Sequence, residues 1–268
     1  MKISSLPWES AWITGAGRGI GAALARLLSQ QGVTVYISAR TPADLEKVKQ
    51  ECLDYSGMVV PIPLDITQPA EIEDMMQSWD QGAGIPELVV LNAGTHDPFA
   101  ATEFSARRCR KLLDINLQGT LNCIDPVLKR YLEKNSGQIA VMTSVAGYRG
   151  LPTAAAYGAG KAALINLCEA LKLDLKGSQI KLQIISPGFV KTPLTDKNRF
   201  KMPAMISADE AAREIIEGLC KERFEITFPK RFTYILKLLR ILPYSIYFRL
   251  LGSLVPTVKP EAIEQKHG

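Results

Sequence analysis

Short apolar runs rich in β-branched residues alternate with longer amphipathic stretches along most of this chain. This alternation constrains the fold most strongly, because it is the pattern of β-α units whose strands pair in parallel. The expected strands are 11–14, 33–38, 58–64, 87–91, 138–143, 181–186 and 225–228. The expected helices are 20–31, 42–52, 69–79, a long helical region reaching Leu132, 155–176, and one that Ser207 and Glu210 begin as a capping box. We predict an α/β fold with a doubly wound, Rossmann-like parallel sheet in a three-layer α/β/α arrangement.

The domain organisation follows from the absence of any break in this series. No repeat, low-complexity segment or composition shift interrupts it before about residue 228. We therefore expect a single catalytic domain, 1–228, followed by a basic, apolar helical extension, 229–268.

The net charge of +5 is unevenly distributed, because residues 226–260 contain six basic residues and no acidic one. The remainder of the chain therefore carries 5 − 6 = −1. Nucleic-acid-binding proteins more typically have a dominant basic surface or a recognisable reading motif, and the main body has neither. We expect no nucleic-acid partner.

The five cysteines are scattered, with no CxxC pair and no clustered histidine. This favours reduced thiols in a cytoplasmic chain and predicts no metal site. The N-terminal residues have no apolar segment before Glu9 that could act as a signal peptide. No uncharged apolar run approaches the roughly 20 residues needed to span a bilayer. We expect a cytoplasmic protein, with attachment to the inner membrane surface as an alternative.

A glycine-rich segment, Thr14-Gly15-Ala16-Gly17-Arg18-Gly19-Ile20-Gly21, joins the first strand to the first helix. Glycines there permit a tight turn and a close backbone approach, and the helix N-terminus offers N–H groups to a pyrophosphate. Ordinary turns also use glycines, but this position between strand and helix favours a dinucleotide site.

Tyr157 and Lys161 lie four residues apart in a predicted helix, so their side chains project from one face. A nearby ammonium favours the phenolate and lowers the tyrosine pKa from its usual value of about 10. Such a pair suits general acid/base chemistry, although the spacing alone also describes an ordinary solvated pair.

The spacing Thr-Gly-x-x-x-Gly-x-Gly resembles the short-chain dehydrogenase/reductase family. Further motifs of that family follow in order within residues 8–228: Asp65, Asn92-Ala93-Gly94, Asn116, Ser144, Tyr157 with Lys161, and Pro187-Gly188 with Thr192. The resemblance implies a nicotinamide-dependent oxidoreductase that interconverts a carbonyl and an alcohol. A non-catalytic NADP-binding sensor or scaffold is the alternative, and the complete set of reacting residues weighs against it.

The resemblance also implies catalytic roles for Ser144, Tyr157, Lys161 and Asn116. Tyr157 would exchange a proton with the substrate oxygen, and Ser144 would hydrogen-bond the same oxygen. Lys161 would bind the nicotinamide ribose and hold the tyrosine pKa down, and Asn116 would orient a water in a proton relay. Gly160 departs from the family, which often has serine there, and with Gly158 it is expected to permit close packing.

The same resemblance implies a cofactor-binding set made of Gly15, Gly17, Arg18, Gly19, Ile20, Gly21, Arg40, Asp65, Asn92, Ala93, Gly94, Tyr157, Lys161, Pro187, Gly188, Val190 and Thr192. Within it, Asp65 would contact the adenine and Thr192 the nicotinamide carboxamide. Asn92 would stabilise the central sheet beside the cofactor.

The choice of cofactor rests on the end of the second strand, Ser38-Ala39-Arg40, which has no acidic residue. An NAD site uses a carboxylate there, whereas a 2′-phosphate is better matched by cations. Arg18 and Arg40 resemble the basic positions of NADP-preferring members, although both could simply be solvated. We expect NADP(H).

The extension is predicted to form a helix over 232–242, with Ile235 and Leu238 on one side and Lys237 and Arg240 away from it. A second apolar stretch, 244–255, follows Pro243. Two interpretations stay open: a lid or subunit contact, and peripheral membrane contact through 230–256. Either favours a hydrophobic or lipid-like small-molecule substrate.

Two further expectations concern assembly and His96. The resemblance implies a homodimer or homotetramer formed through the helices that carry Asn116 and Tyr157. We expect His96 to be an ordinary loop histidine, with a place at the mouth of the site as the alternative.

Overall fold

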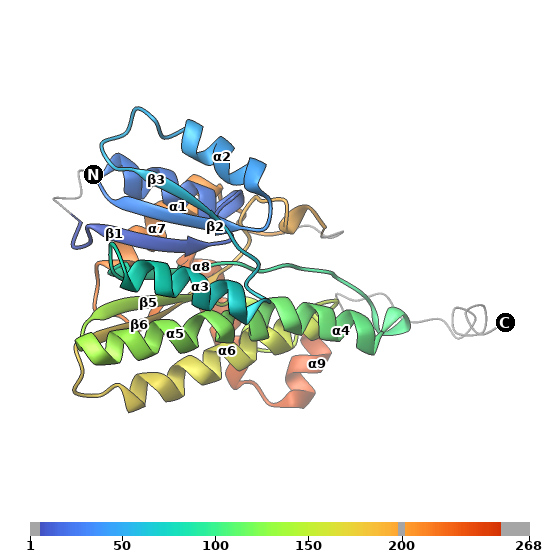
Figure 1. Ribbon diagram of the computed structural model, residues 1–268. Coiled ribbons are helices and arrows are strands. Elements are labelled where there is room, and N and C mark those ends of the chain that lie inside the picture. The colour runs from blue at the N-terminus through green and yellow to red at the C-terminus, as the bar shows by residue number, and fades with distance from the viewer. Residues whose placement is uncertain (1–5, 198–201, 253–268) are drawn as a thin grey trace.

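A single parallel sheet forms the centre of the computed structural model, which describes residues 6–197 and 202–252 (Figure 1). Its seven strands are ordered β3-β2-β1-β4-β5-β6-β7. They are β1 (Ser10–Thr14), β2 (Thr34–Ala39), β3 (Val59–Pro63), β4 (Leu88–Leu91), β5 (Gly137–Met142), β6 (Ile180–Pro187) and β7 (Glu225–Phe228). Every predicted strand is present, and the doubly wound fold is confirmed.

The helices are α1 (Gly19–Gln30), α2 (Pro42–Gln50), α3 (Pro69–Asp80), α4 (Ala106–Leu113), α5 (Gly119–Lys134), α6 (Ala155–Asp174), α7 (Ala208–Leu219), α8 (Lys230–Ile241) and α9 (Tyr244–Gly252). A π-helical segment, η2 (Asp114–Gln118), joins α4 to α5, and short 3-10 turns occur at η1 (Ala101–Glu103), η3 (Val145–Gly147) and η4 (Thr195–Lys197). The predicted capping box is confirmed, because Glu210 N donates to Ser207 Oγ at 3.1 Å and Ser207 N donates to Glu210 Oε2 at 2.8 Å.

Two layers of helices cover the sheet. Buried side chains of α1, α2 and α7 pack on one face, and those of α3, α5 and α6 pack on the other. The strands are apolar on both faces, as a parallel sheet between two helical layers requires. The extension also joins the body, since Phe232 and Leu236 of α8 pack against the cluster on the α6 side.

The prediction of one long helical region after β4 was too simple. Residues 92–100 have no helix, and the helical stretch begins at η1 and α4. The backbone of this loop is held by side chains instead: Asn116 bonds both polar backbone atoms of Thr95, at 2.8 and 2.9 Å. Pro98 also removes a backbone donor that a helix would use.

Parts of several predictions lie outside the described residues. These are positions 1–5, residues 198–201 of the loop 191–206, and everything after Gly252, including 253–256 of the expected membrane contact. Within residues 6–197 and 202–252, no helix is long and apolar enough to cross a membrane. The same ranges contain no group of three or more His, Cys, Asp or Glu residues arranged to hold a metal ion.

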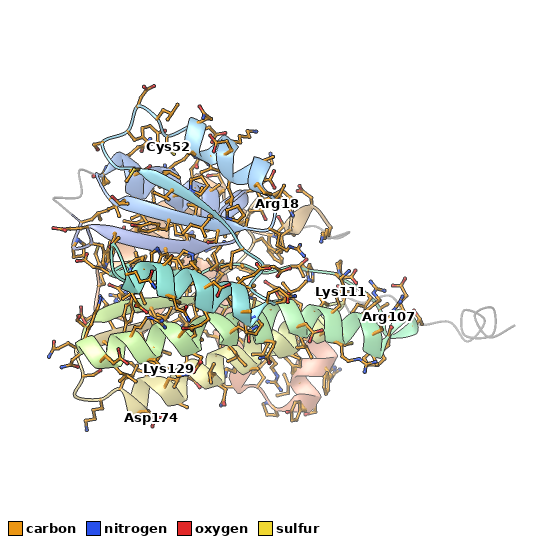
Figure 2. The ribbon with its side chains drawn as sticks, viewed as in Figure 1. Arg18, Cys52, Arg107, Lys111, Lys129 and Asp174 are labelled. Atoms are coloured by element: carbon orange, nitrogen blue, oxygen red, sulfur yellow. The ribbon has the colours of Figure 1, made fainter. Side chains whose placement is uncertain are left out.

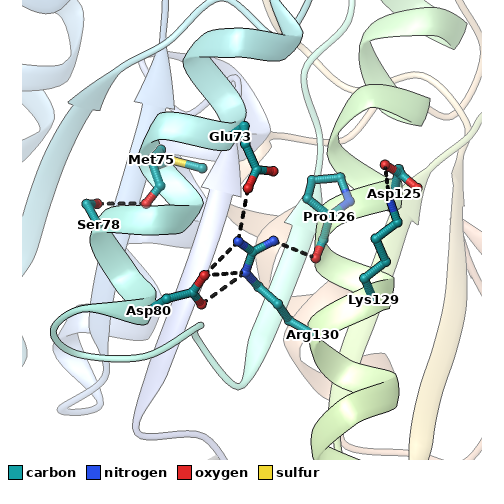
Figure 3. A network of polar contacts seen from close by, with 8 residues as sticks. All are labelled: Glu73, Met75, Ser78, Asp80, Asp125, Pro126, Lys129 and Arg130. Carbon is teal, nitrogen blue, oxygen red and sulfur yellow. Dashed lines mark hydrogen bonds and ion pairs between the residues drawn. The ribbon is translucent and has the colours of Figure 1, made fainter.

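An arginine on α5 joins that helix to α3 (Figure 3). Arg130 donates to the carboxylate of Asp80 at 2.6–3.0 Å and to Glu73 Oε1 at 3.3 Å. Its neighbour Lys129 pairs instead with Asp125 of its own helix, at 2.9 Å. The Arg130 side chain is only 15% exposed, whereas that of Lys129 is 67% exposed, so solvent screens the second pair far more.

We expect Arg130→Gln to lower the free energy of unfolding by about 1–2 kcal/mol, because the forked guanidinium bonds are lost between two helices. The matched change Lys129→Gln should cost less than about 0.5 kcal/mol. Urea denaturation of both variants measures this difference. Equal effects would show that Arg130 contributes no more than a surface pair.

Candidate active site

A cavity of about 360 Å³ opens at the carboxyl edge of the sheet. It is lined by residues that follow β1, β2, β3, β4, β5 and β6. The sheet order reverses direction between β1 and β4, and in open parallel sheets ligands bind beside such a switch point. Arg18, in the loop after β1, lies on this side of the molecule (Figure 2).

Nearly all of the predicted site residues line this cavity. The exceptions are Gly21 and Asn116, which lie behind the loops that line it. A Cβ at Gly21 would lie 2.6 Å from Gly15 O, and a Cβ at Gly94 would lie 2.8 Å from Asn116 Oδ1. Gly21 and Asn116 therefore contact the loops that line the cavity without lining it themselves.

The glycine loop leaves a backbone cradle at the start of α1. Gly15 has φ +66°, and a Cβ there would lie 2.7 Å from Ala93 Cα. The residue before α1, Arg18, makes no side-chain bond to the first turn. The first N–H groups of α1 therefore stay available to an anion, and the cradle fits a dinucleotide pyrophosphate.

The ends of β1 and β4 are fastened together beside this cradle. Asn92 Nδ2 donates to Thr14 O at 3.0 Å and to Gly15 O at 3.1 Å. Ala93 N donates to Thr14 Oγ1 at 3.0 Å. Asn92 thus holds the glycine loop against the central strand, as the resemblance implied.

Ser144, Tyr157 and Lys161 meet at the other side of the cavity. Ser144 precedes η3, where its Oγ accepts a bond from Ala146 N at 3.1 Å, and its hydroxyl is near enough to Tyr157 to act on the pKa of that tyrosine. Lys161 is buried and donates from Nζ to Met142 O at 2.6 Å. Its Nζ lies 5.8 Å from the centre of the Tyr157 ring.

The electrostatics differ from the expected lowering of the tyrosine pKa. Burial raises the pKa of Tyr157, and the hydrogen bond with Ser144 only partly opposes this. Burial also lowers the pKa of Lys161 to about 8. The expectation was therefore wrong in direction for this structure, because desolvation outweighs the opposing effect of Ser144 on the Tyr157 pKa.

Glycines set how closely the Ser144 loop approaches α6. A Cβ at Gly147 would lie 2.8 Å from Lys161 C, and a Cβ at Gly158 would lie 2.9 Å from Ala146 O. A Cβ at Gly160 would lie 3.3 Å from Leu113 Cδ2, on α4. The unusual glycines of this helix therefore permit close packing, as expected.

Asn116 sits in the π-helical segment η2 and is 1% exposed. Its side-chain oxygen accepts from Thr95 N and its amide donates to Thr95 O. In this arrangement the side chain positions the loop after β4. The water relay implied by the resemblance stays a prediction.

The residues after β6 form the remaining wall. Thr195, which the sequence analysis missed, closes this loop: its Oγ1 donates to Val190 O at 2.7 Å and accepts from Thr192 N at 3.1 Å. Gly188 N donates to Phe228 O at 2.8 Å, and a Cβ at Gly188 would lie 2.9 Å from Phe232 of α8. The extension therefore touches the wall that carries Thr192.

The charged groups at the end of the cavity away from Tyr157 include both cations and carboxylates. Arg18 and Arg40 line it and are exposed, and Asp65 Oδ1 accepts from Thr67 N and Oγ1 at 3.0 and 2.9 Å. Asp44, in the first turn of α2, also lines it and packs against Gly17. The sequence analysis overlooked this carboxylate, because it lies beyond the end of β2.

His96 is not an ordinary loop histidine. It is 6% exposed, lines the cavity, and its ring centre lies 4.7 Å from that of Tyr157. Lys197 Nζ donates to its backbone oxygen at 2.8 Å. The preferred expectation was wrong because the Asn116 side chain draws the loop after β4 over the site.

Arg149 clamps the extension to the segment between Ser144 and Tyr157. Its Nη1 donates to the last carbonyl groups of α8 and the residue after it: Leu239 O at 2.7 Å, Arg240 O at 3.0 Å and Leu242 O at 2.6 Å. The guanidinium lies over the ring of Tyr247, 4.1 Å from its centre, and the Tyr247 hydroxyl donates to Gly150 O. Leu151 to Ala154, directly after this clamp, line the cavity.

A second contact holds the middle of α8. Lys237 and the Tyr148 hydroxyl both donate to the carboxylate of Glu225 on β7. Burial favours a higher pKa for Glu225, but the hydrogen bonds from Lys237, Tyr148 and Ser186 outweigh it and lower the pKa. The sequence analysis separated Lys237 from Ile235 and Leu238 but did not say which side of the helix faces the body. In the structure Lys237 faces the body, while Ile235 and Leu238 are each 59% exposed.

Comparison with known proteins places these features in context. The model of the short chain dehydrogenase family matches residues 9–203. An uncharacterized oxidoreductase of Myxococcus xanthus is 31% identical over 245 residues, which cover 91% of this chain and 97% of that protein. The family match includes Ser144, Tyr157 and Lys161, whereas α8 and α9 lie beyond it.

Solved structures show the same fold. An alcohol dehydrogenase of the archaeon Thermococcus sibiricus, complexed with 5-hydroxy-NADP, has TM-score 0.73 and 25% identity over 82% of this chain and 95% of that one. A short-chain dehydrogenase of Sphingobium yanoikuyae, in complex with NADPH, has TM-score 0.75 and 22% identity over 93% of this chain and 97% of that one.

We expect Arg149→Gln to loosen α8–α9 and residues 148–154 together, since one guanidinium bonds the extension beside that segment. Hydrogen bonds to a charged group contribute about 1.5–3 kcal/mol, so amide exchange in both segments should accelerate about tenfold or more. Hydrogen exchange with peptide resolution measures this. Arg26→Gln on α1, which breaks an ion pair with Glu51, is the control and should leave both segments unchanged. Loosening confined to α8–α9 would refute the clamp.

Proposed function

The chain belongs to the short chain dehydrogenase family, and on that premise we propose that it is an NADP(H)-dependent oxidoreductase that interconverts a carbonyl and an alcohol. The observation that carries this proposal is that two hydroxyl residues, Ser144 and Tyr157, line the same cavity as the glycine loop. A protein that only binds a dinucleotide has no need of that hydroxyl pair.

The proposed chemistry divides between cofactor and chain. NADPH, when bound, supplies the hydride. Tyr157 and Ser144 place two hydroxyl groups where a developing alkoxide needs donors, and Tyr157 delivers the proton. A tyrosine hydroxyl with its usual pKa of about 10 is protonated at neutral pH, and burial shifts the Tyr157 pKa in the same direction, which suits the reductive direction. Lys161, fixed by Met142 O, presents a cation to this end of the cavity.

NADP(H) is supported by Arg18 and Arg40, which line the cavity where β2 ends without a carboxylate. The structurally similar Thermococcus sibiricus alcohol dehydrogenase is in complex with an NADP derivative. Asp44 opposes this choice, because a carboxylate repels a 2′-phosphate. The proposal therefore requires the attraction of the two arginines for a 2′-phosphate to exceed the repulsion by Asp44.

A hydrophobic substrate is supported by the lining of the cavity beside Tyr157. Ile115, Leu151, Pro152, Phe189 and Leu194 contribute apolar surface there. Apolar walls with a few convergent polar groups are typical of small-molecule sites. Phe189 also packs against Phe232 of α8, with ring centres 5.4 Å apart and the rings tilted by 39°, so the extension supports this wall.

We also propose a cytoplasmic homodimer or homotetramer. All five cysteines are free thiols, as expected of a reducing compartment. Exposed apolar side chains, Leu132 of α5 and Leu173 of α6, support a subunit contact on the helical layer that carries Tyr157.

The central test is Tyr157→Phe, assayed for NADPH oxidation against a panel of hydrophobic aldehydes and ketones. Turnover should fall below detection while NADPH binding, followed by fluorescence, stays within about twofold, because the ring remains and only the proton donor is lost. Ser144→Ala should lower kcat about 100-fold. Tyr55→Phe, a change of the same kind far from the cavity, is the control. Tight NADPH binding without turnover of any carbonyl by the wild type would favour a sensor or scaffold.

Cofactor choice is tested with Arg40→Gln. We expect the preference for NADPH over NADH to fall about tenfold, with the KM for NADH nearly unchanged, because only the 2′-phosphate loses a cation. Steady-state kinetics with both cofactors measure the ratio, and Arg26→Gln serves as a matched control. An equal loss with both cofactors would place Arg40 outside the phosphate site.

A further inference from the structure

One face of the extension exposes apolar side chains in a regular pattern. The outer face is defined here as Tyr234, Ile235, Leu238 and Ile241 of α8 with Tyr244, Ile246 and Phe248 of α9, each between 48% and 75% exposed. Spacings of three and four residues put the α8 members on one side of their helix. The other large apolar residues exposed in the described chain lie elsewhere: Leu53 and Met58 between α2 and β3, Leu132 on α5, Leu173 on α6, and Phe104 and Met205 in loops. Leu250 follows in α9.

The opposite side of both helices is already committed to the body. Lys237 binds Glu225, Arg149 binds the carbonyl groups at the end of α8, and Tyr247 is 3% exposed. Thr233 is fully buried and bonds Thr227 of β7 at 3.2 Å. The orientation of the helix pair is therefore fixed, and its outer face points away from the core.

The charges beside the outer face have a single sign. Lys230, Arg231, Arg240 and Arg249 are exposed, and residues 226–252 contain no acidic side chain. Apolar and aromatic side chains flanked by cations match the interface of a bilayer that contains anionic lipid. Tyr244 and Phe248, stacked with ring centres 5.7 Å apart, are of the type that favours this interface.

We propose that the outer face of α8–α9 docks the protein on the surface of an anionic phospholipid bilayer. The charge pattern decides between this partner and a second copy of the chain. A two-fold contact would bring the cationic faces together, with no carboxylate on either helix to compensate, whereas anionic headgroups pair with them. Since no described helix can cross a membrane, the association is peripheral.

Docking would bring the substrate wall close to the lipid. The clamp by Arg149 joins α8 to the segment before Leu151 and Pro152, and Phe232 joins it to Phe189. This step rests on the proposed function, because it assigns a bilayer-dissolved carbonyl or alcohol as the substrate. The docking itself does not depend on turnover.

The test is co-sedimentation of the full chain with vesicles, either of phosphatidylcholine alone or with about one third phosphatidylglycerol. At low salt the wild type should partition onto the anionic vesicles at least about tenfold more than onto the neutral ones, and high salt should reduce the difference. Leu238→Gln should weaken binding about tenfold by loss of apolar contact, and Arg249→Gln about fivefold by loss of one charge. Glutamine keeps good helix propensity in both.

The controls match each change. Leu53→Gln removes another exposed leucine, next to Cys52 at the far end of the molecule from α9, and Lys129→Gln removes one positive charge from α5 (Figures 1 and 2). Both should bind vesicles as the wild type does, and NADPH binding should be equal in all variants.

Absence of binding to anionic vesicles, or equal losses in the controls, would overturn the proposal. So would conversion of an oligomer to monomers by Leu238→Gln, since that would assign the face to a second copy. Vesicle binding without turnover would leave docking supported and the oxidoreductase proposal refuted.

Discussion

The parallel direction of every strand is the constraint on which the rest of this structure depends. It brings all the loops that follow strands to one edge of the sheet, so residues far apart in the chain, such as Gly15, Asn92 and Ser144, line one cavity. Parallel strands also need helical crossovers on both faces, which accounts for the two apolar clusters. The reversal of strand order between β1 and β4 then opens the space that the cavity occupies.

Close backbone approaches turn that edge into a reactive site. Gly147 and Gly158 let the loop carrying Ser144 rest on α6, so the serine reaches the tyrosine that this helix presents. Burial has an electrostatic cost, visible in the lowered pKa of Lys161, and a single carbonyl group, Met142 O, binds its ammonium. In this environment desolvation raises the pKa of the Tyr157 hydroxyl more than Ser144 lowers it.

The extension is connected to the chemistry by a small number of polar contacts. Arg149, between the two reacting hydroxyl residues in sequence, bonds the end of α8, and Glu225 bonds Lys237 in its middle. The helix that carries the outer face is therefore connected to the cavity wall by hydrogen-bonded groups. Both α8 and α9 lie beyond residues 9–203, which the family model matches, so the match of that model does not include this connection.

The sequence by itself determined the strands and the place of the glycine loop, and it predicted the candidate reacting residues, because period and motif spacing are local properties. It also identified Gly158 and Gly160 as packing positions. It could not place His96 against Tyr157, or find Thr195, Asp44 and the Arg149 clamp, since each depends on contacts between segments distant in the chain. Only the tertiary structure decided which side of α8 faces the body: a partly buried carboxylate on β7, that of Glu225, draws Lys237 inward and leaves the leucine beside it in solvent.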